Sequence, residues 1–271
     1  MSYALKLACA ALVGAAALPL SEPAMAADLA APEAFVVETM SPIDVSFGVK
    51  GSSEYIVRGV QQTGGDPAIS GYAEVTAFDW VYAGAWGSNV DFGGANDPSA
   101  EFDYYGGLRH TFFEKLTLDV GYVWVDFIGE TSGSRTLDYG KFYGIAKYAL
   151  TEDLTIGANV YYGGDFLNRG VDITHTTAFA KYVVPVKPIP DVGFFVSGSF
   201  SKQWTSENFV KDYLYWDVGG GMTYKAMTLD LRYSDTNLSK SQCFGYIGDR
   251  GACGGRFLAS LSFDTSFSKL K

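Results

Sequence analysis

Apolar and polar residues alternate along most of the chain. In residues 115–126 apolar side chains occupy every second position, while Thr117 and Asp119 point to the opposite side. The same alternation occurs in residues 228–235 and 256–267. Because successive side chains of a strand point to opposite faces, a period of two predicts strands with one apolar and one polar face.

This pattern predicts twelve strands. They cover residues 43–60, 67–78, 80–91, 101–112, 115–127, 138–150, 153–163, 172–184, 191–203, 212–224, 227–236 and 255–267. Aromatic residues make up 15% of the chain and glycine occurs 32 times, a composition that suits many short strands joined by turns.

The connections between the predicted strands alternate between short and long. Short links occur around Asp79 and at Phe113-Glu114, whereas long links such as residues 236–254 are rich in Gly, Asn, Ser and Asp. Tight periplasmic turns and long external loops are typical of a transmembrane β-barrel, whereas a soluble sandwich has no reason to sort its loops by parity. The sequence therefore predicts an all-β fold, a transmembrane antiparallel up-and-down β-barrel of about 12 strands. Because the strand number is even, both termini are expected in the periplasm.

The first predicted strand, residues 43–60, sets the two sides of this barrel. Its alternation places Tyr55 and Val57 toward lipid, and Glu54 and Arg58 toward the lumen. A Lys or Arg that faced the middle of the bilayer would cost roughly 2–4 kcal/mol, which decides the orientation.

The N-terminus carries the pattern of a secretory signal peptide. Lys6 precedes an apolar run that ends at Leu20, and Ala24-Met25-Ala26 has the small-x-small form of a cleavage site. An N-terminal anchor helix is the alternative, but the run is short for a membrane span. The expected parts of the chain are a signal peptide over 1–26, a periplasmic N-terminal strap over 27–42 and the outer-membrane barrel over 43–271.

Charge and hydrophobicity argue against two classes of protein. The formal net charge is −10 and only 20 residues are Lys or Arg, which argues against nucleic acid as a partner. Hydrophobic residues make up 48% of the chain, yet no long apolar run follows the signal peptide, so helical membrane spans are not expected. The chain is therefore either an all-β soluble protein or an outer-membrane barrel, and the loop lengths favour the barrel.

The polar faces of the predicted strands carry charged residues of both signs. The candidates for lining a pore are Lys50, Glu54, Arg58, Asp103, Arg109, Asp119, Asp230 and Arg232, and Lys147, Lys181, Asp217 and Asp264 join them. One interpretation is a constriction that selects solutes by sign. The other is a set of neutralising ion pairs that fills a narrow barrel, because charged groups inside must be paired or hydrated. The two are compatible if water remains in the lumen.

Cys243 and Cys253 share the last long loop. Two cysteines this close in an oxidising compartment are expected to form a disulfide, and closing a loop of about ten residues contributes roughly 2–3 kcal/mol in the chain-entropy model. A zinc site would require four ligands, and neither His110 nor His175 is near in sequence. No metal site and no cofactor is therefore predicted.

Two segments near the start of the predicted barrel resemble a known family. The matching positions are Ser53, Tyr55, Arg58, Gly59, Gln62, Thr63, Asp66 and Pro67 in the first segment, and Tyr82, Gly84, Trp86, Ser88 and Asn89 in the second. In these positions the chain resembles the TorF-like porin family, a proteobacterial outer-membrane family of unknown function of the Gcw_chp type. The resemblance extends over nearly the whole chain after the signal peptide. It implies an outer-membrane barrel that forms a pore, and it brings no solute and no catalytic residue.

The function predicted from these features is that of an outer-membrane porin for passive passage of small hydrophilic solutes. Its expected partners are outer-membrane lipid, these solutes and the barrel-assembly machinery. That machinery commonly reads an aromatic residue at the end of a barrel, and here the aromatic residue Phe267 lies four residues before the end. One alternative is a closed barrel that acts through its external loops as a structural protein, adhesin or receptor. An outer-membrane hydrolase is a further alternative, but its only imidazole bases are His110 and His175, and neither stands in a recognised motif. An enzyme is not predicted, and the oligomeric state is left open.

Overall fold

The structure, a computed structural model, describes residues 43–93, 97–131, 136–186, 188–206 and 211–270. The predicted signal peptide and N-terminal strap, residues 1–42, lie outside the described residues, and both remain predictions.

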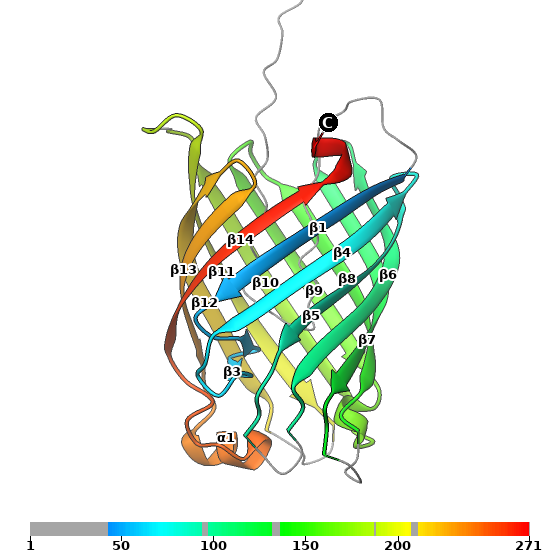
Figure 1. Cartoon of the computed structure of the whole chain (residues 1–271), viewed down its shortest axis with the longest axis vertical. Coiled ribbons are helices and arrows are strands. Elements are labelled where there is room, and N and C mark those ends of the chain that lie inside the picture. Colours follow the sequence, from blue (N-terminus) through cyan, green and yellow to red (C-terminus); the bar gives the residue numbers. More distant parts are fainter. Residues whose placement is uncertain (1–42, 94–96, 132–135, 187, 207–210, 271) are drawn as a thin grey trace, which may run out of the picture.

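Twelve antiparallel strands close into a barrel (Figure 1). They are β1 (Ile43–Ser52), β4 (Ala68–Ala77), β5 (Val81–Asn89), β6 (Ala100–Phe112), β7 (Leu116–Ile128), β8 (Tyr139–Ala149), β9 (Leu154–Gly163), β10 (Ile173–Val184), β11 (Val192–Thr205), β12 (Tyr213–Tyr224), β13 (Met227–Thr236) and β14 (Arg256–Ser266). Each strand pairs with the next in chain order, and β1 also pairs with β14 to close the sheet. The predicted fold class is therefore confirmed.

Every barrel strand except the first lies close to its predicted bounds. The first was predicted over residues 43–60, but β1 ends at Ser52. The chain then reverses at Arg58 and Gly59, whose φ angles are 52° and 74°. This reversal joins two short strands, β2 (Ile56–Val57) and β3 (Val60–Gln61). The prediction was wrong here because apolar and polar residues go on alternating after the chain has left the barrel wall.

The short and the long connections lie at opposite ends of the barrel. The short-turn end carries the C-terminal helix η2 (Phe267–Leu270), whereas the long-loop end carries η1 (Phe166–Asn168) and α1 (Lys240–Ile247) (Figure 1). In the turns 77–80 and 112–115 both central residues have φ between 53° and 61°. Two-residue turns with positive φ match the right-handed twist of the strands that they join. The predicted sorting of connections by length is therefore confirmed.

The barrel has an apolar outer face and a polar inner face. Leu231 and Val120 are 58% and 56% exposed on the outside, whereas their neighbours Asp230 and Asp119 are buried on the inside. The apolar faces predicted for β7 and β13 are thus confirmed. No helix among the described residues is long and apolar enough to cross a membrane.

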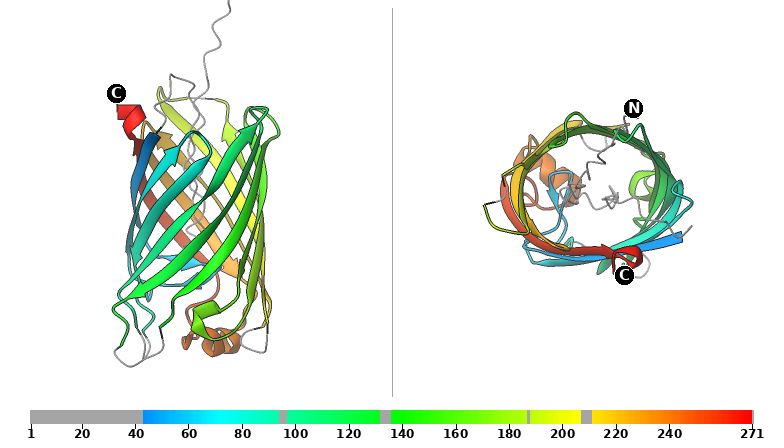
Figure 2. Two further views of the ribbon diagram at one scale, coloured as in Figure 1. Left: turned by 90° about the vertical axis from the view of Figure 1, so that its right-hand side faces the viewer. Right: turned by 90° about the horizontal axis from the view of Figure 1, so that it is seen from above.

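Residues 53–67, called the inner hairpin below, fold into the lumen at the long-loop end. Viewed along the barrel axis, this segment lies inside the ring of strands (Figure 2). Tyr55 and Val57, which were predicted to face lipid, are only 2% and 9% exposed and belong to an apolar cluster with residues of the inner face. That prediction was wrong because both residues lie beyond the end of β1, where strand alternation no longer decides which side is lipid.

Candidate constriction in the barrel lumen

The inner hairpin is held by backbone hydrogen bonds to two long loops. The Gln61 amide donates to the Ala252 carbonyl at 2.8 Å, and the Asp91 amide donates to the Gln62 carbonyl at 2.8 Å. The hairpin is therefore tied both to the loop that follows β5 and to the loop that precedes β14.

Arg58 connects the tip of the inner hairpin to two parts of the barrel wall. Its Nη1 donates to Gln203 Oε1 on β11 at 3.0 Å, and its Nη2 donates to Tyr139 Oη on β8 at 3.0 Å. The guanidinium carbon lies 5.4 Å from the centre of the Phe166 ring. Arg58 is only 4% exposed, so these contacts offset the cost of removing its charge from water.

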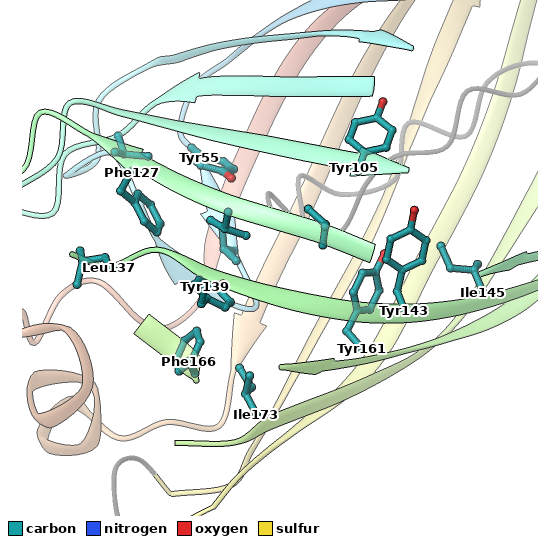
Figure 3. Packing of buried hydrophobic residues seen from close by; sticks show 14 of the residues in the cluster. Tyr55, Tyr105, Phe127, Leu137, Tyr139, Tyr143, Ile145, Tyr161, Phe166 and Ile173 are labelled. Carbon is teal, nitrogen blue, oxygen red and sulfur yellow. The ribbon is translucent and has the colours of Figure 1, made fainter. Parts of the chain in front are cut away.

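Tyr55 connects the same hairpin to a third part of the wall. Its hydroxyl donates to Glu101 Oε2 on β6 at 3.1 Å. Burial, reinforced by the carboxylates of Glu101 and Asp103, holds the pKa of Tyr55 well above its usual range, so the hydroxyl stays protonated and can donate. Figure 3 shows Tyr55, Tyr139 and Phe166 within one cluster inside the barrel. The hairpin is thus anchored to β6, β8 and β11.

A first charged group on the inner face is called the Arg109 triad and consists of Glu74, Arg109 and Asp119. Arg109 Nη1 lies 2.9 Å from Glu74 Oε1, and its Nε lies 2.8 Å from Asp119 Oδ2. The Tyr82 hydroxyl donates to Asp119 at 2.5 Å, and the guanidinium carbon lies 4.0 Å from the centre of the Tyr82 ring. These contacts join β4, β5, β6 and β7 on one side of the lumen.

A second charged group, the Arg232 triad, consists of Asp217, Asp230 and Arg232. Arg232 donates to Asp217, and its Nη2 lies 3.1 Å from Asp230 Oδ2. Its Nη2 also donates to Ser197 Oγ at 2.8 Å. In both triads one guanidinium faces two carboxylates, so the interpretation as paired charges applies to these residues.

The inner face contains the predicted pore-lining residues in a different arrangement from the predicted one. Lys50 is half-buried on the inner face of β1. Glu54 and Arg58 were predicted to share its strand face, which is wrong because β1 ends before them. Glu54 Oε2 instead lies 3.0 Å from Arg256 Nη1, near the start of β14. A role in lining an open pore stays a prediction for the whole set.

Several buried residues of the inner face were not among the predicted candidates. Lys141 on β8 is fully buried, and its Nζ lies 5.3 Å from the centre of the Tyr161 ring. Glu74 and Glu101 are 1% and 2% exposed, so they are buried to the same degree as the predicted Asp103, which is 1% exposed. Each of them obeys the alternation of its own strand, so the signal was present in the sequence. The sequence did not predict which group each of these charges would contact.

The predicted disulfide between Cys243 and Cys253 is present, with the two Cα atoms 5.9 Å apart. Cys243 is fully buried in a cluster that also contains Val60 of the inner hairpin. Val60 forms an isolated antiparallel bridge with Cys253. The disulfide-bonded loop therefore supports the hairpin directly.

Reduction of this disulfide is expected to loosen the inner hairpin. The Gln61 amide should exchange its hydrogen faster in the reduced protein, because its acceptor carbonyl belongs to the residue before Cys253. Hydrogen-exchange mass spectrometry of oxidised and reduced protein measures this, and a non-reduced digest should show the two cysteine peptides linked. Quantitative alkylation of both thiols in the native protein would contradict the disulfide.

The two histidines lie in different surroundings. His110 stacks on Trp80 with ring centres 3.9 Å apart, close to the short-turn end. His175 is fully buried on the inner face and stacks on Tyr161 with ring centres 4.6 Å apart. Within the part of the chain that the structure describes, no three His, Cys, Asp or Glu side chains are grouped so as to hold a metal ion.

A closed barrel of twelve antiparallel strands, with an apolar outer face and a charged inner face, defines the class of transmembrane β-barrels found in outer membranes. The chain belongs to the Gcw_chp family, described as bacterial proteins of unknown function, and the sequence model of that family matches residues 36–257.

Solved structures with the same fold include two porins. The KdgM porin has a TM-score of 0.51 and 8% sequence identity, covering 80% of this chain and 98% of its own. The NanC porin has a TM-score of 0.50 and 11% identity, with the same coverage of 80% and 98%. At such identities the likeness concerns the fold. Comparison with curated proteins gave no match.

Proposed function

We propose that the protein is an outer-membrane porin that gives passive passage to small hydrophilic solutes. The observation that carries this proposal is a closed barrel with an apolar outside and a charged inside, narrowed by the inner hairpin. The long loops lie outside the cell and both termini lie in the periplasm, as in other barrels with short periplasmic turns. The fold shared with two porins supports the proposal, and the TorF-like assignment rests on the two motif-bearing segments of the chain.

Solutes would pass through the part of the lumen that the inner hairpin leaves open. Charges of both signs lie along this route, from Arg58 at the long-loop end to the Arg109 and Arg232 triads on the strands. In a narrow aqueous path each fixed charge affects the passage of charged solutes, so this lining would discriminate between solutes by the sign of their charge.

A closed barrel that acts through its external loops is the second candidate. The observation in its favour is Arg58, which reaches from the hairpin to β8 and β11 and so crosses part of the lumen. Both candidates are non-enzymatic, and neither assigns a catalytic residue.

Reconstitution in planar bilayers separates these candidates. Purified protein is expected to give discrete conductance steps. Lys50→Gln removes a half-buried positive charge from the inner face, so the permeability ratio of potassium to chloride should rise. Lys225→Gln, the same change in an exposed turn outside the lumen, should leave that ratio unaltered. Absence of steps across repeated preparations would favour the closed barrel.

A further inference from the structure

The outer face of the barrel is hollowed over the strands β7 to β11. This hollow, called the outer groove below, has a volume of about 740 Å³. Its floor consists of small residues on three adjacent strands, and bulkier residues on the flanking strands form its sides. The floor includes Gly144 and Ala146 on β8, Ala158 on β9 and Ala178 on β10, and the sides include Val120 on β7 and Phe200 on β11.

The register of the strands explains the groove. Ala146 pairs with Ala158, and Ala158 is followed in the same row by Ala178 on β10. This row ends in Leu118 on one side and in Phe200 on the other. Since the residues all point outward, three adjacent methyl groups leave a depression between two large side chains.

An aromatic row borders the groove on the side of the long loops. It consists of Tyr122, Phe142, Tyr162 and Trp204, which follow one another through paired positions on β7, β8, β9 and β11, with Thr174 between the last two. The Tyr122 and Phe142 rings are 4.9 Å apart at their centres. Tyr162 and Trp204 each lie one residue before the long-loop end of their strand, where aromatic side chains of such barrels lie at the level of the lipid headgroups. The groove therefore lies at the depth of the acyl chains, directly below the headgroups of one leaflet.

Lys202 lies at the edge of the groove beside this aromatic row. Its Nζ is 4.8 Å from the centre of the Trp204 ring. Among the Lys and Arg residues of the described barrel strands, it alone lies on an outer face, because the others alternate with outward apolar residues. A lysine facing lipid is tolerated best near the interface, where its ammonium group reaches the headgroups.

We propose that the outer groove and Lys202 bind one phosphorylated, acylated glycolipid of the outer leaflet. An acyl chain lies in the groove against its small residues, and a phosphate of the headgroup pairs with the Lys202 ammonium. The leaflet follows from the proposed orientation, with the long loops outside the cell. A hollow with an apolar floor fits an acyl chain better than the flat wall of a second barrel, which would also cover the lysine charge.

Binding of purified lipid A to the detergent-solubilised full-length protein tests this inference by native mass spectrometry. Lys202→Gln should weaken lipid A binding by about fivefold, the effect of one basic residue at an anionic membrane surface. Its matched control is Lys225→Gln, which neutralises a lysine that also lies over an aromatic ring, Tyr224, but far from the groove at the short-turn end.

Filling the groove provides a second variant. Gly144→Leu adds a side chain where the nearest atom to a new Cβ is a Val160 methyl at 3.8 Å, so the barrel can accept it. It should lower lipid A binding, whereas Ala259→Leu on the exposed outer face of β14 should not. Equal effects of the two lysine variants, or preference for phosphatidylglycerol over lipid A, would overturn the proposal. The proposal would also be overturned if the native protein formed a dimer that the Gly144→Leu variant dissociates. If the protein did not conduct, the porin proposal would fail but the lipid A binding result would be unaffected. The porin proposal and the lipid-binding proposal can therefore fail independently.

Discussion

A barrel in which residues 53–67 are replaced by Asn-Gly is expected to conduct several-fold more current per channel than the native protein. Ser52 on β1 pairs directly with Ala68 on β4, so a two-residue turn can join the strands without changing their register. The replacement removes Arg58 and Tyr55, which cross the lumen to reach β8, β11 and β6. Single-channel recording at one salt concentration measures the change.

A milder variant separates the presence of the inner hairpin from its anchoring. Arg58→Ala combined with Tyr55→Phe keeps the length of the chain but removes the three side-chain bonds to the wall. We expect its conductance to fluctuate between the native level and the level of the shortened barrel. If the shortened protein folds, as judged by its altered migration after boiling, yet conducts like the native one, the hairpin does not narrow the path.

Arg109→Met is expected to lower the free energy of unfolding by roughly 3–5 kcal/mol, the usual cost of removing one partner from a buried ion group. The change leaves the carboxylates of Glu74 and Asp119, 1% and 4% exposed, without the guanidinium that faces them. Urea unfolding in lipid vesicles, followed by tryptophan fluorescence, measures the loss.

The control for this effect removes all three charges together. In the triple variant Glu74→Gln, Arg109→Met, Asp119→Asn no charge is left unpaired, so much of the stability should return. A loss below about 1 kcal/mol in the single variant would instead indicate that water screens the Arg109 triad as it screens surface pairs.

The strands of the wall could be predicted from the sequence because both of their faces have a fixed environment. Val120 must meet lipid and Asp119 must not, so alternation in β7 reports the fold directly. The register of β6 on β7 is also set close to the turn, since Phe112 pairs with Leu116 across only three residues and this register places Arg109 opposite Asp119.

The inner hairpin could not be predicted in the same way. Tyr55 and Val57 are apolar because they pack against rings inside the lumen, and an apolar side chain in a lumen looks the same in sequence as one in lipid. The partners of the charges were hidden for a related reason. Glu74 reaches Arg109 from β4, across the intervening β5, and no turn fixes the distance between strands that are not neighbours.

The pairing of β1 with β14 has a consequence for how the barrel forms. Every other wall contact joins strands that follow one another in the chain, whereas this seam brings Ser46 beside Ser266. The entropy of closing such a long loop must be overcome before the seam contributes any hydrogen bond, so the local hairpins can form first and the seam last. A chain that lacks β14 would present two open strand edges to lipid, where unpaired backbone groups find no water. The last strand is therefore a condition for stable insertion of all the others.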